Sequence, residues 1–380
     1  MEDLKQIMPK KLGFGCMRLP VANGNSEEID DAVFCRMIDR YMEQGFVYFD
    51  TAYPYHNQKS EEAVRRCLVE RYDRERFLLA DKMPVWLVQN MEDYSEIFER
   101  QLARCGVTYF DFYLFHAMNK TRVEETEKTG GFAFVQKMKT EGRIRHIGFS
   151  FHDTAEALEE ILKNHPEMEF VQLQINYYDW ESENVQSRKC YEVAQKYGVP
   201  VIVMEPVKGG TLANMTGRPA EILKELSPEA SFASYAIRYA ASLENVMLVL
   251  SGMSDEQQLI DNTAYMREFR PLDERERAAI ARVVEELAAM PTIACTKCRY
   301  CVEGCPKKIR IPDIFGVYNM GVQFGLTDVT RGSYRCQIDG SGKAGDCIKC
   351  GKCEAQCPQH LEIRKLLEEA ADIYEKEMHL

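Results

Sequence analysis

Four polar side chains stand where the sequence could gather groups for acid–base chemistry. Asp50 ends one apolar run, and Tyr55 follows it behind Pro54, which restricts the intervening loop. Lys82 and His116 end the two β-rich runs that come next. Alone, Asp50 and Tyr55 would more often be a strand cap and a loop anchor. Three consecutive runs that end in Asp, Lys and His favour a shared reactive site at the carboxyl ends of buried strands.

Two runs of cysteines near the C-terminal end share the spacing C-x2-C-x2-C-x3-C-P. This spacing is typical of two [4Fe-4S] clusters, each held by three cysteines of one run and the last cysteine of the other. The first iron cluster is predicted on Cys295, Cys298, Cys301 and Cys357. The second is predicted on Cys347, Cys350, Cys353 and Cys305. Two zinc knuckles or a set of disulfides are the alternative, but zinc sites seldom use a third close cysteine and a terminal Cys-Pro.

The remaining cysteines are isolated in the sequence. Those that lie among apolar neighbours are expected to be ordinary buried thiols. They are Cys16, Cys35, Cys67, Cys105 and Cys190. Cys336 lies in the long insert between the two cysteine runs, residues 307–346, and is expected to be an inert thiol.

Short β-rich runs alternate with segments of helical periodicity over most of the chain, the pattern of strand–helix units around a parallel sheet. Eight strands are expected, at residues 12–19, 47–49, 76–82, 109–116, 143–150, 169–176, 200–206 and 246–252. A helix is expected after each, the first of them capped by Ser26. Eight such units favour a (β/α)8 TIM barrel. An open doubly wound sheet is the alternative, but the glycine fingerprint that it uses for a dinucleotide is absent.

A change in composition marks the predicted domain boundary. Pro291 stops a helix expected over residues 273–289, and the sequence then becomes rich in Cys, Gly and Pro. We therefore expect a barrel domain at residues 1–289 and a small α+β domain at residues 290–380 that holds the two predicted clusters. An amphipathic helix that begins near residue 361 should cover the clusters or dock on the barrel.

The bulk composition limits the classes of partner. The 380 residues are 45% apolar and 28% charged, as in a globular chain with a full core. The formal net charge of −12 and the lack of a basic stripe argue against nucleic acid and anionic membranes as partners. No run approaches the roughly 18 apolar residues of a membrane span, and no export signal begins the chain. A cytoplasmic location is expected, with free or metal-bound cysteines in place of disulfides.

Five sequence segments resemble the aldo-keto reductases and occur in that family's order. They are FDTAYPY with SEE after it, LADK, DFYLFH, RIRHIGFS and GMSDEQQLIDN. The resemblance covers about residues 12–269 and implies a barrel that reversibly reduces an aldehyde or ketone with a nicotinamide cofactor. The cysteine module resembles bacterial-type 2x[4Fe-4S] ferredoxin domains.

The family resemblance assigns a role to each residue of the reactive site. It makes Tyr55 the general acid that protonates the carbonyl oxygen while hydride reaches the carbon. Lys82, paired with Asp50, would lower the pKa of Tyr55 by placing positive charge beside the phenolate. His116 would orient the substrate oxygen.

The same resemblance implies a cofactor site along the barrel mouth. Ser150 and Gln172 would hold the nicotinamide carboxamide. The pyrophosphate would lie along Lys208, Gly209, Gly210 and Thr211, and the adenosine end would contact Ser254, Gln258 and Asn262.

Three positions depart from the family pattern. Phe151 replaces an Asn that usually binds the carboxamide, and Met204 replaces an aromatic ring that commonly stacks on the nicotinamide. Gln258 stands where an Arg often grips the 2'-phosphate, so the sequence leaves NADH and NADPH both open. His152 is near this mouth and is given no role.

The fused clusters pose a question that the sequence leaves open, because nicotinamide passes two electrons as hydride whereas a cubane passes one. The clusters either exchange electrons with a redox protein partner, directly or through a flavin for which there is no motif, or they are structural. The leading hypothesis is a reductase of a small carbonyl or alcohol substrate whose clusters link it to an electron carrier. The alternative is a non-catalytic electron-transfer or redox-sensing module. Residues 120–131 are expected to be a polar, mobile loop that helps to set the substrate.

Overall fold

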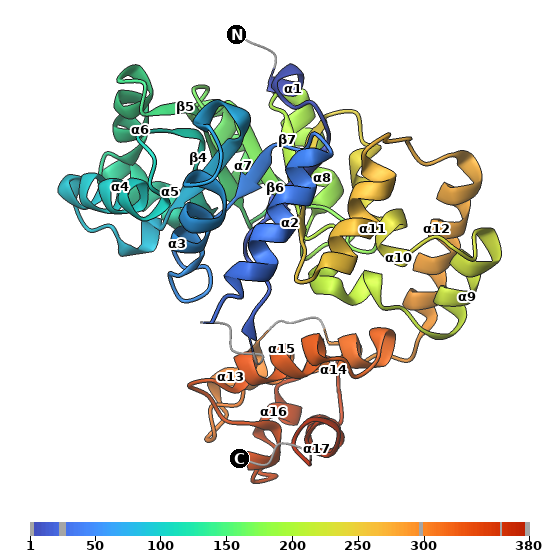
Figure 1. Ribbon diagram of the computed structural model, residues 1–380. Coiled ribbons are helices and arrows are strands. Elements are labelled where there is room, and N and C mark those ends of the chain that lie inside the picture. Colours follow the sequence, from blue (N-terminus) through green and yellow to red (C-terminus); the bar gives the residue numbers. More distant parts are fainter. Residues whose placement is uncertain (1–3, 23–27, 296–298, 358, 377–380) are drawn as a thin grey trace. The chain divides into compact units, whose positions relative to one another are not determined.

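The computed structural model describes residues 4–22, 28–295, 299–357 and 359–376. Eight parallel strands close into a barrel in chain order (Figure 1). They are β1 (Leu12–Gly15), β2 (Tyr48–Asp50), β3 (Leu78–Met83), β4 (Phe110–Met118), β5 (Ile144–Phe151), β6 (Phe170–Gln174), β7 (Val201–Met204) and β8 (Val246–Gly252). The predicted (β/α)8 barrel is therefore confirmed, and each strand falls inside or within two residues of its predicted range.

The register of the barrel depends on at least one close backbone approach. Gly148 of β5 pairs with Phe170 of β6. A Cβ atom on Gly148 would lie 2.5 Å from the carbonyl oxygen of Phe170. A larger residue at this position would push the two strands apart, so the site-bearing end of β5 depends on this glycine.

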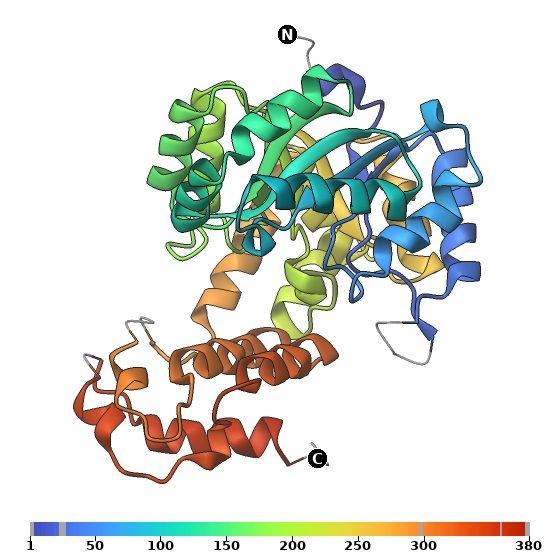
Figure 2. The ribbon, with the colours of Figure 1, turned by 90° about the vertical axis from the view of Figure 1, so that its left-hand side faces the viewer.

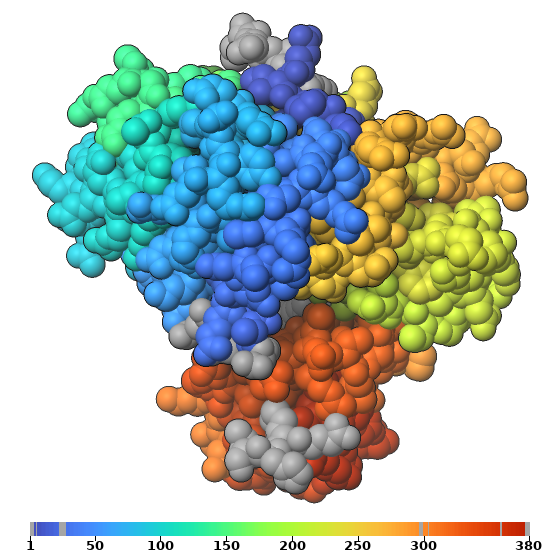
Figure 3. Space-filling view, in the orientation of Figure 1, coloured from blue at the N-terminus to red at the C-terminus, as the bar shows by residue number. Residues whose placement is uncertain are grey.

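Amphipathic helices surround the barrel. They include α2 (Asp31–Glu43), α3 (Ser60–Val64), α4 (Met91–Cys105), α6 (Gly131–Thr140), α7 (Ala155–Asn164), α8 (Ser187–Lys196), α10 (Phe232–Ala241) and α11 (Glu256–Met266). The apolar face of α4 is buried, from Tyr94 to Cys105. In Figure 3 the blue to cyan residues, among which α2, α3 and α4 fall, lie together on one face of this part of the molecule.

Two local predictions about helices need correction. Ser26 lies outside the described residues, and the side chain of Asp30 caps α2 by accepting the Val33 N–H at 3.0 Å. Residues 120–131 are not a mobile loop, because Lys120–Lys128 form helix α5 with Asn119 as its cap. The helix was missed because only Val123 and Thr126 of it are buried, which leaves almost no apolar periodicity.

The chain divides into two compact units. The first comprises residues 1–208 and 233–276 and contains the barrel, and the second comprises residues 209–232 and 277–380. The predicted domain boundary at 289/290 stays a prediction.

The second unit is built from helices. They are α9 (Gly217–Leu226), most of α12 (Glu274–Ala289), α13 (Tyr300–Glu303), α14 (Ile311–Phe324), α15 (Asp328–Ile338), α16 (Lys352–Ala355) and α17 (Ile363–Tyr374). Within its described residues, the β content is a single parallel bridge between Ile309 and Gly342. The insert between the cysteine runs therefore forms two helices, α14 and α15.

A separate apolar core holds the second unit together. The amphipathic helix predicted near residue 361 is α17, and its buried face packs against α14, which lies beside it in Figure 2. The Tyr374 hydroxyl donates to the carbonyl of Val317 at 3.0 Å, and its ring stacks on Tyr334 with centroids 4.8 Å apart. A Cβ on Gly321 would lie 2.3 Å from the Tyr374 hydroxyl, so this contact depends on a glycine in α14.

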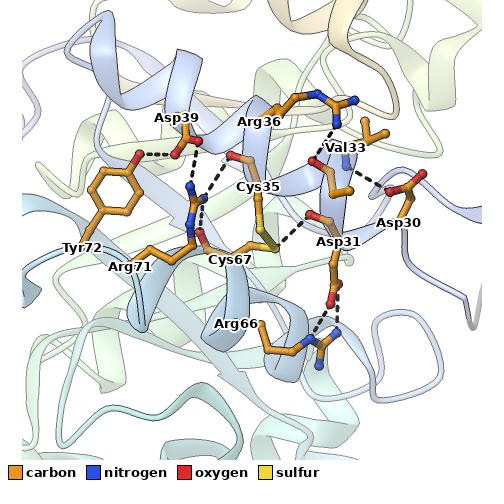
Figure 4. Close-up of a disulfide and its surroundings, with 11 residues drawn as sticks. Asp30, Asp31, Val33, Cys35, Arg36, Asp39, Arg66, Cys67, Arg71 and Tyr72 are labelled. Atoms are coloured by element: carbon orange, nitrogen blue, oxygen red, sulfur yellow. Dashed lines mark hydrogen bonds and ion pairs between the residues drawn. A yellow bond between two sulfur atoms is a disulfide. The ribbon is translucent and has the colours of Figure 1, made fainter.

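Two cysteines of the barrel unit that were predicted to be free buried thiols are joined in a disulfide. Cys35 of α2 and Cys67 of the π-helical segment Arg65–Val69 form a disulfide (Figure 4). The two are separated by 32 positions in the sequence. Their spacing gave no sign of the pairing, because the packing of α2 against this segment is a tertiary contact.

Ion pairs lie on both sides of the disulfide in Figure 4. Arg66 donates to both carboxylate oxygens of Asp31, at 2.5 and 2.9 Å. On the other side, Arg71 donates to Asp39 at 2.8 Å. The Arg66 pair joins the same two segments as the disulfide, and the Arg71 pair links α2 to the chain two residues beyond Val69, so the bridge is one of several links in this region.

Among the residues that the structure describes, no helix has the length and apolarity needed to cross a membrane.

Candidate functional site

Three of the predicted reactive residues meet at the carboxyl ends of β2 and β3. Lys82 Nζ donates to Asp50 Oδ1 at 2.5 Å, to the carbonyl oxygen of Thr51 at 2.8 Å and to the Tyr55 hydroxyl at 3.2 Å. The register pairs Asp50 with Ala80, two residues before Lys82, so both side chains reach the same rim. The side chains of Lys82 and Asp50 are 0% and 3% exposed, and this ion pair is therefore shielded from solvent.

Burial and charge act in opposite directions on this ion pair. Burial lowers the pKa of Lys82, but the negative charge of Asp50 and the hydrogen bonds to Asp50 and Tyr55 outweigh it, and the net pKa is raised. Burial raises the pKa of Asp50, and the Lys82 ammonium offsets part of that shift. The ammonium is thus held charged beside the phenol.

The pKa of Tyr55 was expected to be lowered by Lys82, but it is raised. Burial raises this pKa, and the positive charge of Lys82 lowers it by less, so the net shift is upward. Lys82 acts in the predicted direction, but the sequence did not reveal how completely the phenol is buried. A raised pKa keeps the proton on Tyr55 at neutral pH, which suits a proton donor better than a proton acceptor.

His116 lies beside the phenol at the end of β4. Its ring centroid is 6.0 Å from that of Tyr55, with the rings nearly perpendicular. Burial, together with the charges of Lys82 and Arg122, lowers the pKa of His116 well below its ordinary value, so the imidazole is neutral near pH 7. Within the described residues, its buried Nδ1 atom has no hydrogen-bond partner.

The two residues predicted to hold the carboxamide make hydrogen bonds to Asp50 and to the residue after His116. Gln172 Nε2 donates to Asp50 Oδ2 at 3.2 Å, and Ser150 Oγ accepts the N–H of Ala117 at 2.7 Å. Both side chains are buried. Gln172 thus links β6 to the ion pair, and Ser150 fixes the residue that follows His116.

The predicted pyrophosphate segment begins beside a buried carboxylate that sequence reasoning missed. Lys208 Nζ donates to both carboxylate oxygens of Asp179, at 2.7 and 2.8 Å. Gly209 and Gly210 have φ angles of 67° and 100°, and a Cβ on Gly210 would meet no heavy atom within 4 Å. The backbone at Gly210 is therefore open to close approach, a feature that suits a phosphate-bearing ligand.

The predicted adenosine contacts differ in exposure. Ser254 and Gln258 are exposed, and the Ser254 N–H donates to Gln258 Oε1 at 2.9 Å. Asn262 is buried, and its Nδ2 donates to Ser251 Oγ at 2.9 Å. Ser254 and Gln258 are therefore available to a ligand, whereas Asn262 supports the end of β8.

Two more side chains, those of Trp86 and Arg122, lie near His116 and add an aromatic ring and a positive charge to the site. The ring of Trp86, 41% exposed, lies 5.1 Å from the His116 ring. The guanidinium of Arg122 lies 5.2 Å from the Trp86 ring, and its Nη1 donates to the carbonyl of Ala117 at 2.5 Å. The sequence gave no signal for Trp86, and Arg122 belongs to the unpredicted helix α5.

The cysteines of the second unit line two separate cavities. Cavity one is lined by Cys295, Cys301 and Cys357, together with apolar side chains that include Ile311. Cavity two is lined by Cys305, Cys347, Cys350 and Cys353, and Ile311 also lines it. The structure therefore brings together the crossed cysteine sets that the spacing predicted, except for Cys298, which lies outside the described residues.

The geometry of these cysteines bears on the kind of group that they fit. In the described part of the chain, no three Cys, His, Asp or Glu side chains converge on the position of one metal ion. Cysteines that stand around a cavity, with apolar side chains between them, fit a group of several atoms better than a single tetrahedral zinc.

Two family models match the chain. An aldo/keto reductase family model matches residues 11–285, and a 4Fe-4S dicluster domain model matches residues 294–362. The first match covers the whole barrel, and the second contains all eight predicted cluster cysteines.

Curated relatives and solved structures agree with these matches. An uncharacterized oxidoreductase of Schizosaccharomyces pombe is 25% identical over 297 residues, which are 74% of this chain and 91% of the relative. The holo form of an aldo-keto reductase from Bacillus halodurans is 24% identical with a TM-score of 0.57, over 72% of this chain and 91% of the other. An aldo-keto reductase from Klebsiella pneumoniae, solved in complex with NADPH, is 18% identical with a TM-score of 0.57, over 72% and 90%. These structural likenesses show the barrel fold.

Proposed function

Because the chain belongs to the aldo-keto reductase family, we propose that it catalyses the reversible reduction of a small aldehyde or ketone by NADPH or NADH. The observation that carries this proposal is the buried Asp50–Lys82 ion pair, with the Tyr55 phenol 3.2 Å from Lys82 Nζ. The neutral His116 beside that phenol completes the set. These are the groups needed to protonate an oxygen while its carbon accepts hydride.

Each of these residues has a distinct task in the proposed reaction. The Tyr55 hydroxyl transfers its proton to the carbonyl oxygen, and Lys82 stabilises the phenolate that remains. His116 is neutral and donates an N–H to the same oxygen, which fixes its position. Asp50 keeps Lys82 charged and oriented. When bound, the nicotinamide would supply the hydride.

For the dinucleotide we keep the expected residues, with adjustments to their proposed roles. Ser150 and Gln172 remain the proposed carboxamide contacts, and Gln172 also buttresses Asp50. Gly209 and the open backbone at Gly210, with Lys208 and Thr211, would lie along the pyrophosphate. Ser254 and Gln258 would contact the adenosine end, and Asn262 would act by supporting β8.

In the second unit we assign one [4Fe-4S] cluster to each cavity. Cavity one would be completed by Cys298, and cavity two already has its four cysteines. When bound, each cluster would pass single electrons, and this supports a link between the chain and an electron carrier. No residue of the described chain supports a flavin, and the proposal needs none.

The test is carbonyl-dependent oxidation of NADPH and of NADH by the anaerobically purified protein, over a panel of aldehydes and ketones. Tyr55→Phe is the matched control, because it keeps the ring and removes only the acidic proton. Turnover that is present in the native protein and falls about 10²-fold or more in the variant is expected. Equal turnover in both proteins would refute the assigned acid.

One observation favours the alternative of a non-catalytic electron-transfer module. Phe151 is buried and Met204 half-buried at positions where cofactor contacts are expected, and Gln172 is already bonded to Asp50. Titration of the cluster-loaded protein with NADH and NADPH separates the two functions. Failure of both to bind, while the clusters can still be reduced, would favour the alternative.

A further inference from the structure

We propose that the rim of cavity two docks a small, acidic, one-electron carrier protein. The rim consists of Lys307, Lys308, Ile348, Lys349 and Lys352. The inference rests on the proposed function, since it needs a cluster in cavity two, and it adds where the carrier binds and what chemistry its surface has.

The rim lies directly on the cavity. Lys307, Ile348 and Lys352 line cavity two together with its cysteines. All three are also exposed, as is Cys350, and 56% of the Ile348 surface is open to solvent. A partner that covers these side chains would therefore reach the edge of the cavity, where electron transfer distances are shortest.

The charge of the rim is opposite to that of the chain as a whole. The segments 305–310 and 347–353 contain five basic residues and no acidic one, in a chain of formal net charge −12. The described residues give no ion pair to Lys307, Lys308 or Lys352, whereas Lys349 is paired with Glu368. Lys307 and Lys352, which line the cavity with the exposed Ile348, thus carry positive charge without an ion pair to a described residue, and so does Lys308, the neighbour of Lys307 in the chain.

Cavity one lacks this arrangement. Among the described residues that line it, Arg299 carries the charge, and both of its Nη atoms donate to the Asp313 carboxylate, at 2.9 and 3.1 Å. Its charge is therefore compensated at the surface. Of the two cavities, cavity two has the edge that would attract a negatively charged protein.

The distribution of charge also orients such a partner. An acidic carrier would be repelled by most of a chain with net charge −12 and attracted to the lysines of the rim, so encounters are steered to one place. The exposed Ile348 supplies an apolar centre inside a charged border, the anatomy of a transient interface. Cys305, Cys347, Cys350 and Cys353 would hold the cluster that accepts one electron from the carrier, and the carrier would be oxidised by that one electron, with no bond broken and no proton moved.

The experiment mixes the anaerobic, cluster-loaded full-length protein with a purified, reduced, acidic 2Fe-2S ferredoxin in a stopped-flow instrument. The variant Lys307→Glu, Lys308→Glu, Lys352→Glu removes the positive rim. The matched control Lys137→Glu, Lys163→Glu, Lys196→Glu makes the same change of charge at exposed positions of α6, α7 and α8. Binding of the oxidised ferredoxin by calorimetry gives a readout that does not depend on turnover.

In the rim variant, the association rate constant and the affinity for the ferredoxin should each fall about tenfold or more, and most of their salt dependence should disappear. In the control variant, both quantities should change by less than about threefold. Equal losses in both variants, or none in either, would overturn the proposal. A dimer of the chain that the rim variant abolishes would also overturn it, because the rim would then bind a second copy.

Two checks separate this inference from the proposed function. Reduction by dithionite and quantitative EPR show whether each variant has its clusters, and a native protein without clusters would refute the cluster assignment in the proposed function. Milder Lys→Gln changes at the same three positions cover the case in which the Glu variant fails to assemble. If dithionite reduces the clusters of the native protein and the reduced ferredoxin does not, the docking rim is refuted and the proposed function is not.

Discussion

The two units of the molecule hold their reactive groups in different ways. In the barrel, Lys82 donates to three oxygens at once and Gln172 adds a bond to Asp50, so the protein alone fixes the site. In the second unit, the cysteines stand around cavities on short helices and connecting segments. The comparison teaches that the barrel site is organised by its own side chains, whereas the cluster unit should owe much of its order to the groups that it binds.

Removal of the clusters is expected to have the largest effect and tests this comparison directly. Chelation of iron should raise the amide exchange rates of α13 to α16 by about 10²-fold or more, because cluster ligation is part of the folding free energy there. The strands β1 to β8 should keep their protection. The measurement is hydrogen exchange by mass spectrometry, and unchanged exchange in the second unit would show that its apolar core suffices without iron.

Breaking the buried ion pair is the next largest change. Lys82→Met leaves the Asp50 carboxylate buried without its ammonium, and the free energy of unfolding should fall by about 3–5 kcal/mol. Urea unfolding followed by circular dichroism measures it. The double variant Lys82→Met, Asp50→Leu removes both charges and should recover part of the loss. A double variant less stable than Lys82→Met would contradict the account of an uncompensated charge.

The disulfide of the barrel unit is expected to contribute somewhat less. Replacement of Cys35 and Cys67 by Ala should lower the free energy of unfolding by about 2–4 kcal/mol, because the bridge restricts the unfolded chain. The ion pairs of Arg66 and Arg71 remain, so the fold should survive. Cys190→Ala is the control for loss of a buried thiol without a bridge. If the double variant is no less stable than that control, the bridge does not form in solution.

The effect of pH should be smallest and should report on His116. Its pKa is lowered in the folded protein, while the unfolded chain binds a proton near pH 6.5. The unfolded state then binds more protons, so the free energy of unfolding falls as the pH drops below about 6.5, by up to about 1.4 kcal/mol per pH unit. Comparison with His116→Gln over pH 5–8 isolates this contribution, and parallel curves for the two proteins would exclude it.

Local sequence patterns were enough to predict the barrel, because buried parallel strands appear as apolar runs. They also placed Asp50, Lys82 and His116 at the carboxyl ends of their strands. Helix α5 escaped because a polar helix with few buried residues has no periodicity to detect. Spacing likewise predicted which cysteines share a cavity, apart from Cys298, which the structure does not describe.

What the sequence missed depends on distances that only tertiary structure sets. The net pKa shift of Tyr55 reflects the depth of its burial, and the disulfide joins cysteines on segments that meet only after folding. Asp179 approaches Lys208 from a different loop. Trp86 becomes part of the site only because it packs beside His116.

The central claim is that the Tyr55 phenol of the barrel site is the general acid that protonates the carbonyl oxygen of the substrate. The most direct test is a single anaerobic turnover of one accepted aldehyde at saturating cofactor, followed at the nicotinamide absorbance in native protein and in Tyr55→Phe. The account predicts that the rate constant falls about 10²-fold or more while the cofactor dissociation constant is unchanged. An unchanged rate constant in the variant would contradict it.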